Sequence, residues 1–280
     1  MEATASRSRS YSVVYGLARS IWFNHDLARC WMSVFTAYYD VSGQQSDKGG
    51  ALIVAAVVAT AEKHKKFETA WRKVLGEFDV PHFHMKEFAH SRGVYAEWKG
   101  KGPQRIAFLK QLIVVMKRHL NKSFSVWLPL AEFKDISARY DFPDALKQPF
   151  SFCATRCRLN VEKWMVKRYP GQRLAHVFES GDAGLGPFVD MTARVWKMPV
   201  TILPKVDPRS GERLHQFEAA DFLAWERHDI YSDDLAGERR QLRESFLAMH
   251  RHLPHDGQVF TGESLERMCR VNPEIYPART

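Results

Sequence analysis

The segment Ala51–Thr60 reads ALIVAAVVAT and contains the longest apolar run in the chain. A continuous run of this kind is typical of a strand that is covered on both faces of a sheet. The preceding segment Val34–Asp40 is rich in β-branched and aromatic residues and is followed by a Ser42-Gly43 turn, which predicts another strand. The two segments together predict a β-sheet built from the early part of the chain.

Helical and extended segments alternate after these strands. Periodic apolar positions predict helices at residues 67–78, 103–120, 150–169, 187–195 and 214–230. Further strands are expected at residues 124–130, 174–179 and 200–203. Pro103 and Pro187 suit the first turns of two of the helices, on which Ile106 and Val195 would point inward. This alternation predicts an α/β fold.

One domain with added segments is expected. Residues 1–31 begin with a Ser/Arg-rich stretch and predict a disordered or leader segment, so that Met32 is a candidate native start. The α/β domain would span residues 32–231. Residues 131–149 hold two prolines and predict a loop-rich insertion. Residues 232–280 predict a C-terminal extension that is helical around 238–250 and irregular afterwards.

The composition restricts the class of protein. Of the 280 residues, 45% are hydrophobic and 26% are charged, values that exclude a disordered tail, a disulfide-stapled mini-protein and a collagen-like fibre. The longest apolar run is too short to cross a bilayer. The chain carries 41 Lys and Arg against 32 Asp and Glu, a formal charge of +9, which favours nucleic acid as a partner.

The four cysteines, Cys30, Cys153, Cys157 and Cys269, are too few and too scattered for a disulfide framework. This pattern indicates a reducing compartment, and we expect a cytoplasmic protein. Cys153 and Cys157 lie four residues apart on the apolar stripe of a predicted helix, which favours a place in the core over a metal or redox site.

Acidic residues end two of the predicted strands. Asp40 ends the first strand and Glu179 ends a later one, and strand ends are where α/β proteins place their sites. Capping of the following turn is the alternative for each acid.

Asp221 lies on the predicted inward stripe of the last helix, with Phe217, Ala220 and Ala224. A carboxylate on a buried face costs several kcal/mol, in order of magnitude, unless a cation or hydrogen-bond donors meet it. The sequence leaves two explanations open, a structural arginine partner or a divalent metal shared with other carboxylates.

The segment His82-Phe83-His84-Met85-Lys86-Glu87 is a further candidate. A helix that starts here would bring His84 and Glu87 onto one face, with Glu87 as a metal ligand and His84 near the reaction centre. Two alternatives stay open. Glu87 is also a favourable first-turn acid, and His82 with His84 could bind zinc, although no third close ligand completes a zinc set.

These residues also carry a family resemblance, over about residues 32–230. The chain resembles a bacterial family known as domain of unknown function 3800, which is grouped with the ribonuclease H-like superfamily. The matching elements are Tyr39-Asp40-Val41-Ser42-Gly43, the apolar strand after it, His84-x-x-Glu87, the strand that ends in Glu179, and Gln216-x-x-Ala219-Ala220-Asp221-Phe222-Leu223-Ala224. The resemblance implies a mixed five-stranded sheet flanked by helices, with four acids meeting at one point.

The chain departs from the family pattern at three positions. Val41 stands where the family usually has Glu, His215 where it has Leu, and Glu179 where it has Asp. Because Glu179 carries an extra methylene, Asp182 is a candidate substitute ligand.

The resemblance implies a divalent-metal-dependent nuclease that hydrolyses phosphodiester bonds of nucleic acid by a two-metal mechanism. Mg²⁺ or Mn²⁺ would be held by Asp40, Glu87, Glu179 and Asp221, with His84 assisting water or product departure. Carboxylates suit these hard ions. The alternatives are a catalytically inactive nucleic-acid or protein-binding module of a mobile-element or defence system, and a metal hydrolase acting on a small phosphoester.

Three basic segments are candidates for tracking a phosphate backbone: Lys63–Lys66, Lys99–Arg105 and Lys163–Arg173. An ordinary solvated surface is the alternative for each. The sequence leaves DNA against RNA, strandedness and oligomeric state open.

Overall fold

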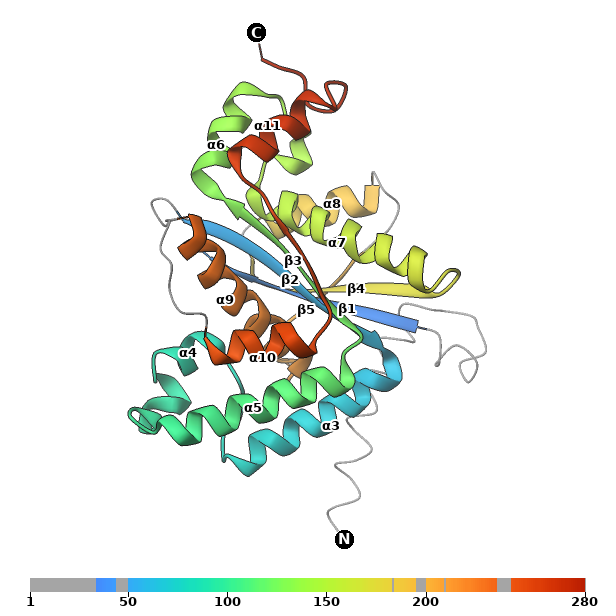
Figure 1. The fold of residues 1–280 in the computed structure, drawn as a ribbon. Coiled ribbons are helices and arrows are strands. Elements are labelled where there is room, and N and C mark those ends of the chain that lie inside the picture. The colour runs from blue at the N-terminus through green and yellow to red at the C-terminus, as the bar shows by residue number, and fades with distance from the viewer. Residues whose placement is uncertain are drawn as a thin grey trace.

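The computed structural model describes residues 34–43, 50–182, 184–194, 200–208, 210–235 and 243–279. The described strands form one sheet in the order β5-β4-β1-β2-β3-β6 (Figure 1). Strand β2 is antiparallel to β1 and β3, whereas the other neighbouring pairs are parallel. The strands are β1 (Val34–Ser42), β2 (Ala51–Thr60), β3 (Lys122–Pro129), β4 (Arg173–Glu179), β5 (Thr201–Leu203) and β6 (His255–Val259).

Helices cover both faces of this sheet and extend beyond its two ends (Figure 1). The α-helices are α3 (Ala61–Glu77), α4 (Met85–Ala89), α5 (Gly102–His119), α6 (Leu130–Arg139), α7 (Pro149–Arg168), α8 (Leu185–Arg194), α9 (His215–Leu235), α10 (Glu244–His252) and α11 (Gly262–Arg270). Two short 3₁₀ helices are η2 (Gly93–Trp98) and η3 (Asp144–Leu146). In the described residues, no helix is both long enough and apolar enough to span a membrane.

The sheet separates two hydrophobic clusters. Because side chains alternate along a strand, Tyr38 of β1 enters the cluster that contains α3 and α9, while Tyr39 enters the cluster that contains α7. The apolar run of β2 contributes to both, with Ile53 in the first and Val54 in the second. The prediction of a strand covered on both faces is confirmed.

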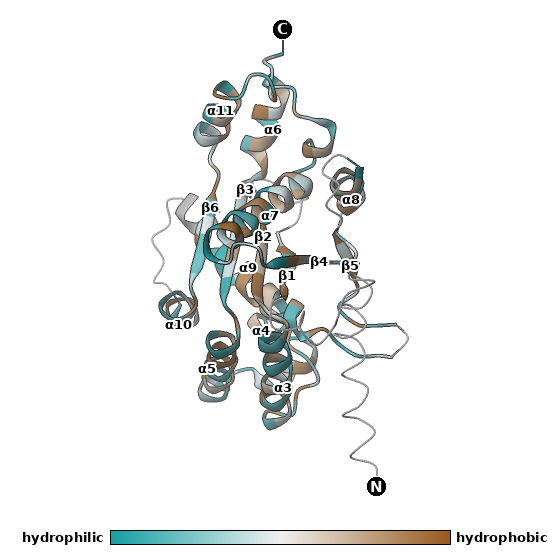
Figure 2. Ribbon diagram, turned by 90° about the vertical axis from the view of Figure 1, so that its right-hand side faces the viewer, coloured by the Kyte–Doolittle hydropathy of each residue, from teal (hydrophilic) through white to brown (hydrophobic). Residues whose placement is uncertain are grey.

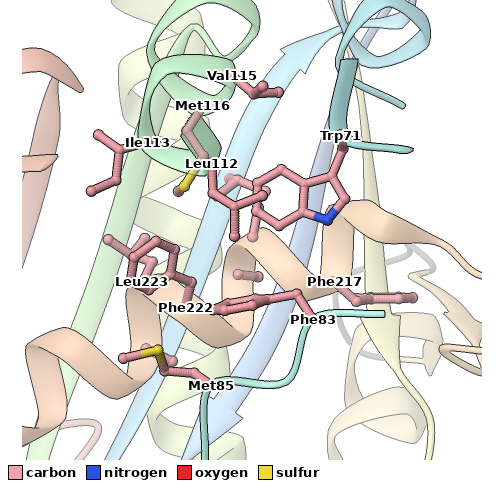
Figure 3. Packing of buried hydrophobic residues seen from close by; sticks show 14 of the residues in the cluster. Trp71, Phe83, Met85, Leu112, Ile113, Val115, Met116, Phe217, Phe222 and Leu223 are labelled. Atoms are coloured by element: carbon pink, nitrogen blue, oxygen red, sulfur yellow. The ribbon is translucent and has the colours of Figure 1, made fainter. Parts of the chain in front are cut away.

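The first cluster fixes the segment that leads into α4. In the view of Figure 3, Trp71 of α3 lies above Phe83 and the α9 residue Phe222, and Met85 lies below them. The ring centroids of Phe83 and Phe222 are 5.2 Å apart. Trp71 also donates its indole N–H to Glu218 Oε2 at 2.7 Å. This packing holds the start of α4 against α9, where the candidate site lies.

The α/β class and a mixed sheet flanked by helices are confirmed, but the sheet has a sixth strand. Residues 255–259, expected to be irregular, form β6 and pair in parallel with β3. The segment reads His-Asp-Gly-Gln-Val and carries no apolar alternation (teal in Figure 2). It is held instead by polar contacts, since the His255 ring nitrogens bond Ser123 Oγ at 2.9 Å and Ser125 Oγ at 3.1 Å. Burial, with the nearby Arg227 charge, lowers the pKa of His255 to about 2.

The prediction of a loop-rich insertion at residues 131–149 is wrong. This stretch forms most of α6, followed by η3, because Phe133 and Ile136 bury one side of α6 in the second cluster. Pro143 and Pro149 lie outside α6, and Pro149 instead begins α7.

Other boundaries and inward positions differ in smaller ways. On α5, Ile106 is 54% exposed and Phe108 is buried in its place, so the apolar stripe is offset from the predicted one. Helix α9 continues to Leu235, beyond the expected domain boundary at residue 231. Residues 1–31 and Val195 lie outside the described residues, so the division into domains stays a prediction. Cys153 and Cys157 are buried in the second cluster, as expected.

Candidate active site: a buried carboxylate cluster

Asp40 lies in β1 on the same face as Tyr38, toward α9, and is only 8% exposed. Burial raises the pKa of its carboxyl well above the usual value, and the nearby Asp221 and Glu179 raise it further, while Lys205 opposes them. The Glu179 carboxyl is also close enough to Asp40 for a hydrogen-bonding interaction to contribute to this rise in pKa. The first strand and the fourth therefore place their terminal acids together.

Asp221 joins this pair from α9. It lies beside the buried Phe217 and Ala220 and is 7% exposed, so the predicted inward position is confirmed. Its Oδ2 accepts a 2.8 Å hydrogen bond from the backbone N–H of Met85. Burial raises the pKa of Asp221, and Lys205 and the Met85 N–H act against that rise. The charge of this enclosed carboxylate therefore depends on Lys205 and on the Met85 N–H.

Glu179 and Asp182 lie at and just after the end of β4. Glu179 Oε2 is 3.1 Å from the ammonium of Lys205. Burial, together with the Glu179 charge, raises the pKa of Asp182 to about 7. Glu179 is thus a common neighbour of three acids, and its charge raises the pKa of Asp40, Asp182 and Asp221.

Lys205 supplies the positive charge at the centre of this group. It follows β5, and its ammonium is largely shielded from solvent. Burial acts to lower its pKa, but Asp40, Asp221 and Glu179 together raise it. Asp221 therefore has a cationic side chain nearby, as one of the two explanations required, but this side chain is a lysine rather than the expected arginine. The sequence held a signal for it, because Lys205 closely follows the strand beside β4.

The structure places Glu87 in a different group. Its carboxylate lies 3.6 Å from His82 Nε2 and 3.4 Å from His84 Nδ1. Gly93, with a positive φ of 56°, lets the chain approach, because a Cβ there would lie 2.6 Å from Glu87 Oε2. His84 connects this group to the first, since its charge lowers the pKa of Asp221.

Glu218, a fully buried residue of α9 that the sequence reasoning missed, is at the centre of a structural network. It accepts from Trp71 Nε1 and from Arg213 Nε, and lies 3.0 Å from His215 Nδ1. Burial acts to raise its pKa, but the hydrogen bonds from His215 and Trp71 outweigh burial and lower it. The His215/Glu218 spacing of three residues on a helix was the available signal. This network anchors the first turn of α9, one turn before Asp221.

In the part of the chain that the structure describes, no three His, Cys, Asp or Glu side chains are grouped so that they could hold a metal ion as they stand. The donor chemistry nevertheless fits Mg²⁺ or Mn²⁺, because the four acids offer only hard oxygen ligands. The net charge of the site also suits a divalent cation. One ammonium meets four carboxyls, and three of these carboxyls have a raised pKa. In the described arrangement, Lys205 supplies the cation.

The solved structures that are similar to this chain share little sequence with it. No protein-family model and no curated protein sequence matches the chain, so the family resemblance stays a prediction. Two similar solved structures are Bst-RNase HIII in complex with Mn²⁺ (12% identity, TM-score 0.40, 80% of this chain and 66% of that one) and a mutant protein of the same Bst-RNase HIII (14%, 0.41, 81% and 67%). A third is ribonuclease H2 from Pyrococcus horikoshii OT3 (14%, 0.33, 75% and 81%).

The fold is of the predicted α/β class, with a mixed sheet flanked by helices. Strands β1 to β5 form the expected mixed five-stranded sheet, with β2 opposite in direction to the others. This chain spans about two thirds of the length of the two RNase HIII chains.

Proposed function

We propose that this protein is a divalent-metal-dependent nuclease that hydrolyses phosphodiester bonds of nucleic acid. The observation that supports this function best is the convergence of Asp40, Glu179 and Asp221 from β1, β4 and α9 in a buried place with too little positive charge. Buried carboxylates that are not fully compensated destabilise a fold, and sites of function are where such groups cluster.

In this proposal Asp40, Glu179 and Asp221 hold the metal, with Asp182 as a further oxygen donor. Mg²⁺ or Mn²⁺ bound there would activate a water molecule and stabilise the leaving oxygen. The Met85 N–H fixes the Asp221 carboxylate through its 2.8 Å hydrogen bond. Lys205, 3.1 Å from Glu179 Oε2, orients Glu179 and adds positive charge next to the position of a phosphate.

Glu87 and His84 take a supporting role rather than the ligand role expected for Glu87. Glu87 lies 3.4 Å from His84 Nδ1 and orients its ring. His84 is partly exposed and is close enough to Asp221 to affect its pKa. A positioned imidazole of this kind can pass a proton to a departing product oxygen.

A second candidate function is supported by Lys205. If the lysine is a permanent counterion, the cluster is a structural centre and the protein is an inactive ribonuclease H-like module that binds nucleic acid or a protein. The formal charge of +9 suits nucleic acid in both cases.

The deciding experiment compares the wild type with Asp40→Asn and Asp221→Asn on single- and double-stranded DNA, RNA and hybrids, with Mg²⁺, Mn²⁺ or EDTA. We expect cleavage only by the wild type and only with metal, while both variants keep nucleic-acid binding. Asp190→Asn is the matched control, because Asp190 is an exposed acid of α8. Absence of both cleavage and metal binding by calorimetry in the wild type would establish the inactive module instead.

A further inference from the structure

A basic groove lies between the C-terminal half of α7 and the edge strand β6. Its volume is about 680 Å³, and four cations line it, Lys122, Lys163, Lys167 and Arg168, with Asp256 as the one acid among the lining residues. These charges leave an excess of three positive charges. We refer to this feature as the α7–β6 groove.

One wall of the groove is a regular row along α7. Asn160, Lys163, Trp164 and Lys167 are spaced at i, i+3, i+4 and i+7, so they share one face of the helix. The seven-residue span corresponds to about 10 Å of helix. Lys163, Lys167 and Arg168 are exposed, and no ion pair to a described residue involves any of the three.

The floor of the groove is ordered by contacts between segments. Lys122 Nζ lies 2.6 Å from Asp256 Oδ2 and 5.9 Å from the Trp164 ring centroid. Asn160 donates from Nδ2 to Gln258 Oε1 at 3.1 Å. Because Lys122 neutralises Asp256, the three cations of α7 remain available to an anionic ligand.

The groove is separated from the carboxylate cluster by the sheet. Lys122 and Asp256 lie on the face of Phe124, which belongs to the second hydrophobic cluster with α7. Asp40 points to the other face, toward α9. The groove is therefore not a wall of the proposed active site.

We infer that the α7–β6 groove binds the phosphodiester backbone of nucleic acid as a second, sequence-independent site; this inference depends on the proposed function only for the substrate class. The row of about 10 Å along α7 matches about three phosphates of one strand, at about 3.4 Å of helix axis each. Side-chain amides beside the cations suit phosphate and sugar oxygens. The concave shape favours a strand over a flat anionic membrane.

The test is binding of labelled oligonucleotides by the full chain in EDTA, followed by fluorescence anisotropy over a range of salt. We expect Lys163→Glu with Lys167→Glu to weaken binding about tenfold or more and to reduce the salt slope by about 1.4, or about 0.7 for each lost contact with a single strand. The double variant Lys163→Gln with Lys167→Gln should show a smaller loss in the same direction.

The matched control is Lys110→Glu with Lys134→Glu, which makes the same change of charge at exposed positions of α5 and α6. Equal losses in the groove and control variants would overturn the inference, and so would unchanged nucleic-acid binding combined with weaker binding to phosphatidylserine vesicles. A wild type that binds through the groove but never cleaves would contradict the proposed function and leave the groove intact. Cleavage by the wild type, combined with unchanged nucleic-acid binding by the groove variants, would support the proposed function and contradict the groove inference.

Discussion

The backbone N–H of Met85, the first residue of α4, lies 2.8 Å from Oδ2 of Asp221 on α9. Together with the charge of Lys205, this hydrogen bond stabilises a carboxylate whose ionisation is opposed by burial and by Glu179. It connects the His84-x-x-Glu87 segment to the helix that carries Asp221. The orientation of Asp221 therefore depends on a backbone N–H, which only a proline at position 85 removes.

Replacement of Met85 by proline removes this donor without breaking α4, because proline is tolerated at the first position of a helix. It also removes the buried Met85 side chain, a loss that Met85→Ala shares. The preceding residue, His84, already has the extended conformation that proline requires, with φ −139° and ψ 114°. We expect Met85→Pro to be less stable than Met85→Ala by about 1.5–3 kcal/mol, the value of a hydrogen bond to a charged group. Urea denaturation of both variants measures this difference in the free energy of unfolding. Equal stabilities would show that the hydrogen bond from the Met85 N–H to Asp221 does not contribute to stability.

Neutralising one acid of the cluster is expected to stabilise the metal-free protein. Asp40 is buried next to Asp221 and Glu179, and its pKa is raised, so its ionised form is unfavourable at neutral pH. We expect Asp40→Asn to increase the melting temperature in EDTA. The control Asp190→Asn removes an exposed acid and should leave it unchanged. A lower melting temperature for Asp40→Asn would mean that Lys205 already compensates the charge fully.

Removing the cation should have the opposite effect. Lys205→Met would leave the carboxylates without a positive partner, and breaking a buried pair in this way costs about 3–5 kcal/mol. We expect the melting temperature in EDTA to fall and Mn²⁺ to restore more of it than in the wild type. Lys205→Arg keeps the charge and is the control. A variant that Mn²⁺ does not stabilise at all would argue that no ion can take the place of the lysine.

His255 predicts a pH dependence outside the site. Its pKa is lowered to about 2, first by burial and then by Arg227, while an unfolded histidine titrates near about 6.5. Because the unfolded state binds the extra proton, stability falls as the pH decreases below about 6.5, by up to about 1.4 kcal/mol per pH unit.

The measurement is denaturant unfolding of the wild type and His255→Gln between about pH 6.5 and pH 4.5, within the window set by the two pKa values. The wild type should lose more stability over this range, since other histidines contribute equally to both proteins. Identical slopes would show that His255 is protonated in the folded chain.

The elements with strong local patterns were predictable from the sequence. The apolar run of β2 and the inward stripe with Asp221 on α9 needed no knowledge of distant residues. Strand β6 could not be predicted, because its place on β3 depends on hydrogen bonds between the His255 ring and the hydroxyls of Ser123 and Ser125 rather than on an apolar pattern.

Which residues belong to the candidate site was harder to predict. Asp40, Glu179 and Asp221 were expected to meet, and the structure brings them together. The direction of the Glu87 side chain depends on Gly93, where the absence of a Cβ makes room for the carboxylate. The sequence predicted an arginine or a metal as the cation beside Asp221, whereas the position of Lys205 depends on the pairing of β5 with β4.

The position of β6 has a consequence for synthesis. In the part of the chain that the structure describes, the outer side of β3 pairs with a segment that ends at Val259, so the ribosome must synthesise the residues up to Val259 before this edge of the sheet is complete. Until then Phe124 and Val126 lie on a bare edge, the kind of surface that pairs with other chains. Because β6 is hydrophilic, the edge that it forms in the folded protein resists such pairing.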